Sequence, residues 1–268
     1  MNARSDLPGP GATVAHGTGT VPQSAIESPL AGRVAVITGA SSGIGRAIAL
    51  ALAAHRASVC LIGRDPDRLA SAARGASTKS PRVLVQQADL GREDEVDRLA
   101  HRLHAELVGL DVLVHSAGIF RGGSYAEATA QELELMYGVN VKAPYRLTQA
   151  LLPLLRSSRG HVVFINSSAG LRAGRTNGLY ASTKHALRAL ADSLRDEVNA
   201  DGIRVLSVYP GRVATPIQPQ LFAAEGKPYD PTQLLQPEDV AAMVIAALSL
   251  PHGAEVTDIS MRPTRKSY

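Results

Sequence analysis

Short, almost wholly apolar runs that alternate with longer amphipathic stretches constrain the fold of this 268-residue chain more than any other feature. Runs such as Val-Ala-Val-Ile (34–37) and Val-Val-Phe-Ile (162–165) are typical of strands buried on both faces of a parallel sheet. We predict seven strands, at residues 33–38, 58–63, 82–88, 111–116, 161–167, 204–209 and 255–261. We predict helices at residues 43–56, 65–74, 92–107, 129–139, 141–157, 180–200 and 237–250. This alternation predicts an α/β fold with a doubly wound, parallel seven-stranded sheet, Rossmann-like and forming a single domain.

The first thirty residues differ in composition from the rest of the chain. Gly, Pro, Ser and Thr make up 14 of them, so we predict a disordered leader at 1–30 and one folded domain at 31–268. The longest apolar runs, 47–54 and 240–248, are too short to cross a membrane, for which ~20 residues are needed. The lone cysteine, Cys60, cannot form an internal disulfide, which favours a reducing, cytoplasmic location.

The distribution of basic residues argues against nucleic acid as a partner, and the distribution of histidines argues against a metal. The 28 basic and 24 acidic residues are scattered, and Trp is absent, whereas nucleic-acid binders concentrate bases on one face and interleave aromatics. His101 and His104 share a helical face but have no third ligand nearby, so we expect no metal. We therefore expect a small-molecule partner, without nucleic acid or membrane.

A glycine-rich segment, Thr-Gly-Ala-Ser-Ser-Gly-Ile-Gly (38–45), joins the first predicted strand to the first helix. A pyrophosphate binds backbone N–H groups at a helix N-terminus only where no side chain obstructs its approach. Gly39 would allow the tight exit from the strand, Gly43 the close approach of the phosphate, and Gly45 the packing of helix against sheet. The segment therefore indicates nucleotide binding, although a glycine-rich turn can also be no more than a turn.

The end of the second strand indicates which dinucleotide is bound. NAD-binding proteins place a carboxylate there to bind the ribose 2′-OH, whereas this chain has Gly63 followed by Arg64. A guanidinium would instead hold the 2′-phosphate of NADP, with Arg46 as a further candidate. We expect Asp65 to cap the next helix, with Pro66 at its first position. Asp89, after the third strand, is placed near the adenine, although it could equally be a solvated loop residue.

Tyr180 and Lys184 open a strongly helical stretch. Residues four apart share a helical face, so the phenol and the ammonium point the same way. A cation close to a tyrosine stabilises the phenolate and lowers its pKa, which suits the phenol to general acid/base catalysis. This pair alone is a weak signal, because Tyr and Lys are frequent on amphipathic helices.

These segments together resemble the short-chain dehydrogenase/reductase family. The matching motifs are the glycine segment 38–45, Asp89, Asn140, Ser167, Tyr-Ala-Ser-Thr-Lys (180–184) and Pro210-Gly211, in the family's order over residues ~32–261. The resemblance implies an NADP-dependent (NADPH-using) oxidoreductase that interconverts an alcohol and an aldehyde or ketone. One departure is His115-Ser116, where the family usually has two asparagines, and we expect it to remove a hydrogen-bond link between strands.

The resemblance also assigns roles to single residues. Tyr180 would be the general acid/base, Lys184 would hold the nicotinamide ribose and lower the pKa of Tyr180, and Ser167 would bind the substrate oxygen, with Ser168 the nearest alternative. Asn140 would hold a water that links Lys184 to solvent, and Thr215 would touch the nicotinamide carboxamide. The implied cofactor contacts are Gly39, Ser41, Ser42, Gly43, Ile44, Gly45, Arg64, Asp89, Leu90, Ser116, Ala117, Gly118, Tyr180, Lys184, Pro210, Gly211, Val213 and Thr215.

Two other functions share parts of this pattern. A non-catalytic NADP-binding sensor or scaffold would have no need of Tyr180, Lys184, Ser167 and Asn140 together. A sugar-nucleotide epimerase or dehydratase would carry a larger substrate-binding part after Gly211 than this chain has.

Three further expectations concern the substrate and the assembly. Residues 212–236 would form a flexible lid, with Leu221 and Phe222 as apolar contacts, over a small or medium, partly apolar substrate. The C-terminal segment 255–264 resembles family branches that act on small hydroxy acids or aldehydes. Family members commonly pair through the helices at 141–157 and 180–200, which implies a homodimer or homotetramer.

Overall fold

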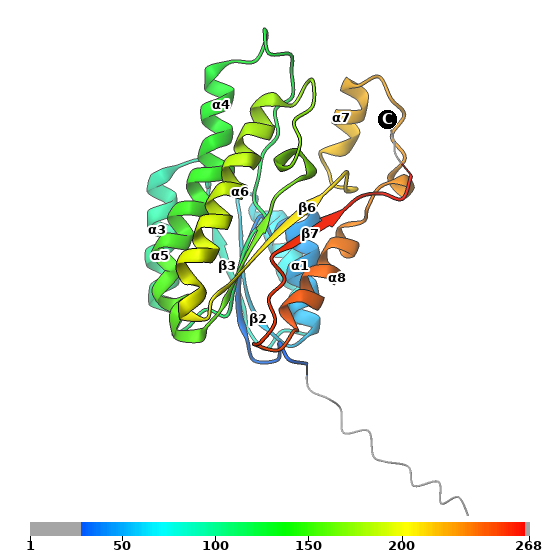
Figure 1. Ribbon diagram of the computed structural model, residues 1–268. Coiled ribbons are helices and arrows are strands. Elements are labelled where there is room, and N and C mark those ends of the chain that lie inside the picture. The colour runs from blue at the N-terminus through cyan, green and yellow to red at the C-terminus, as the bar shows by residue number, and fades with distance from the viewer. Residues whose placement is uncertain (1–27, 266–268) are drawn as a thin grey trace, which may run out of the picture.

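A single parallel sheet organises the structure, a computed structural model that describes residues 28–265 (Figure 1). Its seven strands lie in the order β3-β2-β1-β4-β5-β6-β7. They are β1 (Val34–Thr38), β2 (Ser58–Gly63), β3 (Val83–Gln87), β4 (Val112–His115), β5 (His161–Ile165), β6 (Arg204–Pro210) and β7 (Asp258–Met261). The order turns back on itself at β1 and β4, where doubly wound sheets bind their ligands. The predicted fold class is confirmed.

Eight α-helices connect the described strands. They are α1 (Gly43–Ala54), α2 (Pro66–Ser77), α3 (Glu93–Glu106), α4 (Ala130–Tyr137), α5 (Ala143–Ser158), α6 (Gly178–Val198), α7 (Gln218–Ala224) and α8 (Pro237–Leu248). Asp65 caps α2 by accepting the backbone N–H of Arg68 at 3.0 Å, with Pro66 at the first helical position, as the sequence indicated. The caps and proline positions thus begin the helices close to where the pattern placed them.

The helices form a layer on each face of the sheet, and each layer encloses its own apolar core. Helices α1 and α8 cover one face, where Ile48 and Val244 pack against Ile37 and Val208. Helices α3, α5 and α6 cover the other (Figure 1), where Leu99, Leu147 and Leu187 are buried. Central strands are therefore buried on both sides, which explains why their sequences are apolar at nearly every position.

The segment between β6 and α8 differs from the flexible lid that we predicted at 212–236. It contains helix α7 and a 3₁₀ turn at Pro231–Gln233, and Val213 pairs with Leu235 in an isolated parallel bridge. Phe222 is buried and meets the Tyr229 ring edge-to-face at 5.5 Å. The sequence pattern did not indicate this helix, because a short helix with one buried aromatic residue carries little periodicity to detect. Leu221 lines the cavity as expected, whereas Phe222 does not.

The predicted leader extends beyond the described residues at its N-terminal side. Its last residues belong to the fold, because Leu30 is buried in the core and the Ser28 hydroxyl lies 2.7 Å from Nδ1 of His55. Residues 1–27 lie outside the described part. Among the helices of residues 28–265, none combines the length and the apolar character that a membrane crossing requires.

Candidate active site

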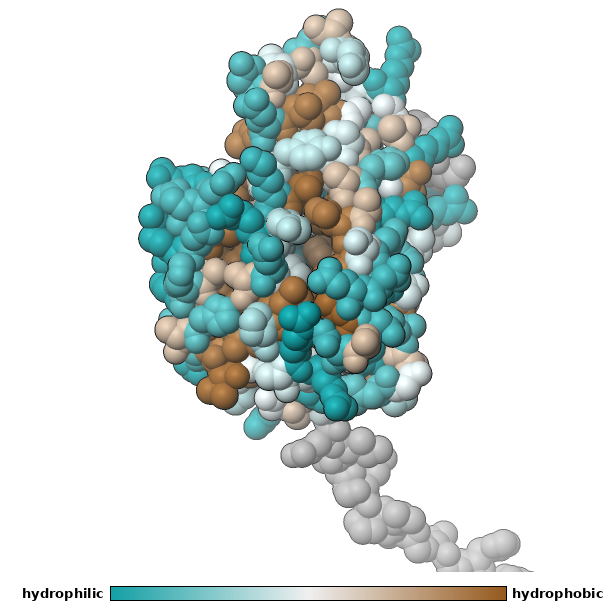
Figure 2. Space-filling view, turned by 60° about the vertical axis from the view of Figure 1, so that its left-hand side comes forward, coloured by the Kyte–Doolittle hydropathy of each residue, from teal (hydrophilic) through white to brown (hydrophobic). Residues whose placement is uncertain are grey.

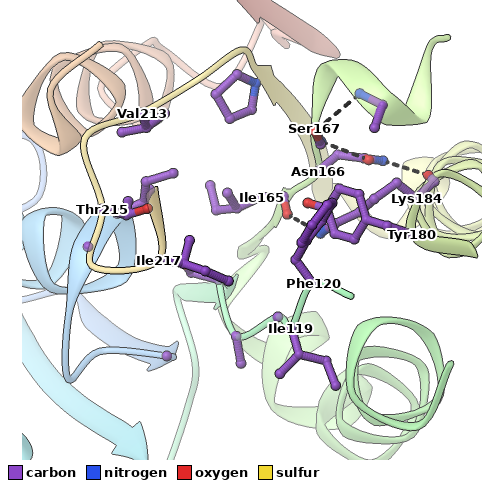
Figure 3. A pocket seen from close by; sticks show the side chains of 18 of the residues that line it. Ile119, Phe120, Ile165, Asn166, Ser167, Tyr180, Lys184, Val213, Thr215 and Ile217 are labelled. Carbon is purple, nitrogen blue, oxygen red and sulfur yellow. Dashed lines mark hydrogen bonds between the residues drawn. The ribbon is translucent and has the colours of Figure 1, made fainter. Parts of the chain in front are cut away.

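A cavity of about 960 Å³ opens at the carboxyl ends of the strands. Loops that follow β1, β2, β3, β4, β5 and β6 all contribute to its lining, together with the first turns of α6 and α7. Figure 3 shows Ser167, Tyr180 and Lys184 on one side of this space and Val213, Thr215 and Ile217 on the other. It is the place where parallel doubly wound sheets gather residues from distant parts of the chain.

The glycine segment after β1 lies so close to neighbouring parts of the chain that side chains would not fit at its glycines. Gly39 has φ +68°, and a β-carbon there would lie 2.8 Å from the backbone nitrogen of Ala117. Gly43 has φ +53°, and a β-carbon there would lie 3.1 Å from Cγ2 of Thr215. At Gly45 a β-carbon would lie 2.4 Å from the carbonyl oxygen of Gly39, so this glycine packs the helix against the loop and does not line the cavity. The backbone cradle thus fits a pyrophosphate group at the start of α1.

The end of β2 leaves room next to that cradle. A β-carbon at Gly63 would lie 3.3 Å from Oγ of Ser41, and no carboxylate occupies this position. Arg64 is exposed and lines the cavity, and its carbonyl accepts Nε2 of Gln87 at 3.0 Å. Arg46, our second candidate for the 2′-phosphate, is not among the lining residues. The vicinity of Ser41 and Arg64 therefore suits a phosphate on the ribose better than a free hydroxyl.

The loops after β3 and β4 line the same end of the cavity. Asp89 lies at the cavity with Leu90, and its Oδ1 accepts the backbone N–H of Gly91 at 3.0 Å. The backbone N–H groups of Ser116 and Ala117 donate to Oγ1 of Thr38 at 3.1 and 3.2 Å. Thr38 thereby fixes the loop after β4 against the end of β1.

His115 replaces a hydrogen-bond link to neighbouring strands by a link to a helix. Its ring is buried, stacks on Phe164 at 5.1 Å, and has Nε2 2.8 Å from Oγ1 of Thr148 in α5. Burial lowers the pKa of His115 to about 3, so the ring is neutral at physiological pH. The ring thus bonds to α5 in place of the link between strands that we expected this departure to remove.

Tyr180 and Lys184 lie one turn apart on α6 and both line the cavity. Nζ of Lys184 lies 5.7 Å from the centroid of the Tyr180 ring and donates to the carbonyl of Ile165 at 2.9 Å. Burial lowers the pKa of Lys184 to about 8. Burial raises the pKa of Tyr180 to about 12, against the smaller, lowering effect of a hydrogen bond with Ser167. The expected depression of the Tyr180 pKa by Lys184 is therefore not seen in this structure, where desolvation of the phenolate raises the pKa.

Ser167 follows β5 directly and begins a 3₁₀ turn, Ser168–Gly170. Its hydroxyl accepts the backbone N–H of Ala169 at 3.1 Å and acts on Tyr180 as noted above. Ser168 also lines the cavity, but it does not shift the pKa of Tyr180, whereas Ser167 lowers it. Ser167 therefore stays the proposed substrate-binding serine. The Tyr180 ring is itself fixed by an edge-to-face contact with Phe120 at 5.0 Å.

Asn140 lies behind the cavity, in a π-helical turn, Gly138–Lys142, between α4 and α5. Its Oδ1 accepts the backbone N–H of Ile119 at 2.9 Å, and its Nδ2 donates to the Ile119 carbonyl and to Oγ1 of Thr183. These bonds connect the loop after β4 with α6. A β-carbon at Gly118 would lie 3.3 Å from Oδ1 of Asn140 and 3.9 Å from Nζ of Lys184. Asn140 therefore lies behind Gly118 and supports this part of the cavity wall next to Lys184.

All the other site residues that we predicted from the sequence line this one cavity, including Pro210, Gly211 and Val213. The sequence did not indicate a further set of lining residues, because little in their local pattern distinguishes them from ordinary loop residues. These are Ala88, Ile119, Phe120, Val139, Ile165, Asn166, Ala169, Arg172, Ala173, Gly174, Thr176 and Asn177. Arg212, Pro216, Ile217, Gln218, Leu221 and Glu225 lie in the segment 212–236 that we predicted over the substrate. Ala88, Ile165 and Asn166 could have been found from their places at the ends of predicted strands.

The sheet order, the glycine cradle and the cavity define a nucleotide-binding protein of the doubly wound α/β class. Within that class the chain belongs to the short-chain dehydrogenase family, whose model, described as short chain dehydrogenase, matches residues 33–226.

Similar proteins and similar solved structures agree with this family assignment. The chain is 35% identical to an uncharacterized oxidoreductase of Staphylococcus aureus, over 87% of this chain and 98% of the relative. Among solved structures, it is similar to an alcohol dehydrogenase from the archaeon Thermococcus sibiricus complexed with 5-hydroxy-NADP. The identity there is 30% and the TM-score 0.78, over 88% of this chain and 99% of the other. It is also similar to L-sorbose reductase from Gluconobacter frateurii complexed with NADPH and L-sorbose, with 29% identity and a TM-score of 0.79, over 87% and 95%.

Proposed function

We propose that this protein is an NADP-dependent oxidoreductase that interconverts an alcohol and an aldehyde or ketone on a small to medium metabolite. The observation that carries the proposal is the gathering of Ser167, Tyr180 and Lys184 in one cavity with the glycine cradle. Similar proteins named as an alcohol dehydrogenase and a sugar reductase, both complexed with NADP-type nucleotides, support it.

The residues at the nucleotide end fit NADP. Gly39, Gly43 and the N-terminus of α1 would hold the pyrophosphate, and Arg64 with Ser41 would hold the 2′-phosphate. Asp89 would lie at the adenine, and Val213 with Thr215 at the nicotinamide. When bound, NADP supplies or accepts the hydride at the substrate carbon.

The residues at the catalytic end would move the proton. Ser167 would hold the substrate oxygen, and Tyr180 would donate its proton to that oxygen during reduction and accept it during oxidation. A pKa of about 12 keeps the Tyr180 phenol protonated at neutral pH, which suits the reduction. Lys184 would hold the ribose hydroxyls and, through Asn140 and solvent, return the proton to Tyr180.

The experiment that tests the proposal is a screen of NADPH consumption over aldehydes, ketones and oxo acids with the purified protein. On any substrate found, Tyr180→Phe removes the proton donor and keeps the ring, so kcat should fall by at least ~10²-fold. The affinity for NADPH, measured by fluorescence titration, should change little. A variant that retains a third of the wild-type kcat would show that Tyr180 is not the acid/base.

A further inference from the structure

The segments after β5 and β6 contribute charged residues to the cavity lining that the proposed reaction does not use. Arg172 comes from the segment after β5, and Arg212 and Glu225 come from the segment after β6. The other residues that line this part of the cavity are mostly apolar or small, with Leu221 and Gly174 among them. A charged group next to apolar residues is stable only with a partner of opposite charge or a hydrogen-bond partner. The donors that have no such partner within the protein therefore indicate what a ligand would supply.

Arg212 is only partly paired within the protein. Its guanidinium lies over the Phe222 ring, with Cζ 4.7 Å from the centroid, and Nη2 binds the carboxylate of Glu225. Nη1 is buried and has no hydrogen-bond partner among the described residues. A guanidinium has five N–H donors in a fixed fork, so a second oxyanion can bind beside Glu225.

The balance of charge in this part of the cavity is positive. The Glu225 carboxylate already has two cations, because Lys227 lies 3.1 Å from it in addition to Arg212. Arg172 is exposed and forms no ion pair with any described residue, while its backbone N–H donates to the Ser168 carbonyl at 3.1 Å. The 3₁₀ turn after Ser167 thus fixes the backbone of Arg172 close to the proposed catalytic serine.

We infer that the substrate carries an oxyanion, a carboxylate or a phosphate ester, which Arg212 and Arg172 bind while its carbonyl group lies at Ser167 and Tyr180. This inference rests on the proposed function and narrows its substrate to small anionic carbonyl compounds and the corresponding alcohols. The amide oxygen Oε1 of Gln218 is also buried in the cavity lining and has no hydrogen-bond partner in the described part of the chain, so it can accept a hydrogen bond from a hydroxyl of the same molecule.

The test measures binding and does not depend on turnover. Malonate, methyl phosphate and the neutral malonamide are titrated calorimetrically into the complex of the full chain with NADP⁺, at constant ionic strength. At least one anion should bind ~10-fold or more tightly than malonamide, the loss expected for one charge-assisted contact. Comparison of malonate with methyl phosphate shows which oxyanion the site takes.

Single substitutions then assign the contact. Arg212→Gln and Arg172→Ala should each weaken binding of the preferred anion by ~3-fold or more, the smaller effect falling on the more exposed Arg172. Arg175→Ala is the matched control, because Arg175 is an exposed arginine three residues from Arg172 that does not line the cavity. It should leave the affinity within about 2-fold, as distant exposed charges are screened. Arg172 is exposed, so its variant tests the inference even if Arg212→Gln unfolds.

Equal binding of malonamide and both anions, or no anion binding, overturns the inference, as does an equal loss in the Arg175→Ala control. This outcome is distinguishable from failure of the proposed function. A wild-type protein that reduces neutral aldehydes with NADPH but binds no anion contradicts the inference alone. One that binds the anion through Arg212 but reduces no carbonyl compound contradicts the proposed function alone.

Discussion

Arg64 is the residue on which the choice between the two dinucleotides depends. It follows Gly63, which supplies no carboxylate to bind a ribose hydroxyl, and it lies at the cavity near Ser41. Its neighbour Asp65 is turned toward Arg68, whose backbone N–H and Nε it binds, and so does not repel a phosphate directly. The end of β2 thus offers the 2′-phosphate a guanidinium and places no free carboxylate beside it.

We expect the unmodified protein to prefer NADPH over NADH by roughly 10- to 150-fold in kcat/KM, the range of one charge-assisted contact. Arg64→Ala should remove most of this preference through the KM for NADPH, with kcat nearly unchanged, because the contact is the same in ground and transition states. Arg74→Ala is the matched control, since Arg74 is an exposed arginine of α2 that does not line the cavity. Equal kcat/KM for the two nucleotides in the unmodified protein would contradict the assignment.

His115 couples the stability of the fold to pH. Its pKa falls from 6.5 in the unfolded chain to about 3, because burial disfavours the charged ring. The unfolded state therefore binds the proton more readily, and the stabilisation is complete above pH 6.5 and is lost as the pH falls toward 3. Between these values His115 contributes a slope of up to about 1.4 kcal/mol per pH unit.

His115→Asn removes this titrating group and should flatten the acid side of the stability profile by about 1 kcal/mol per pH unit. The measurement is urea unfolding of both proteins at a series of pH values below 6.5. His161, whose pKa burial also lowers to about 3, stays in both proteins and cancels in the comparison. Parallel profiles for the two proteins would show that His115 does not titrate in this way.

At the scale of elements, the contact between the glycine segment and α1 decides whether the cradle can form. Gly45 lies in the first turn of α1, where its hydrogen faces the carbonyl oxygen of Gly39. Gly178 also lies in the first turn of a helix, α6, but a β-carbon there would meet nothing within 4 Å. Both glycines lie in the first turn of a helix, but only at Gly45 would a β-carbon meet neighbouring backbone.

Gly45→Ala should destabilise the protein by about 1–3 kcal/mol or more, because the clash is with backbone and cannot be relieved by a side-chain rotation. Gly178→Ala should leave stability unchanged or raise it by about 0.4–1 kcal/mol, through the lower entropy of the unfolded chain. Thermal unfolding followed by circular dichroism distinguishes the two. Equal melting temperatures for the two variants would mean that the close approach at Gly45 costs nothing.

At the scale of the whole molecule, the layer that contains α5 and α6 is the face through which we propose that copies of the chain associate. Figure 2 shows groups of apolar side chains between hydrophilic ones on this side of the molecule. Tyr145 of α5 is 50% exposed there, and Leu135 of α4 is also exposed. Exposed aromatic and aliphatic side chains on helices that flank a long helix are suited to a symmetric contact.

Light scattering at micromolar concentration should give two or four times the 28.1 kDa mass of one chain. Tyr145→Glu places a charge in the proposed contact and should shift the mass toward one chain. Met243→Glu is the control, because Met243 is 43% exposed and lies on α8, which covers the opposite face of the sheet. A single 28 kDa species for the unmodified protein would exclude this association.

The sequence by itself determined the elements and the nucleotide end of the site. Strands buried on both faces must be apolar throughout, and a phosphate cradle must consist of glycines at fixed spacing, so both leave a local pattern at 34–37 and 38–45. Tyr180 and Lys184 also form a local pattern, because one turn of α6 brings them together.

Only the tertiary structure decided the substrate end and the protonation of the site. Arg172 and Arg212 are forty residues apart and both line the cavity because β5 and β6 are neighbours in the sheet, which no local pattern records. Helix α7 is organised around Phe222, Tyr229 and Arg212, contacts between residues that carry no periodicity. The pKa values of His115, Tyr180 and Lys184 depend on how completely water is excluded around them, and burial is a property of packing.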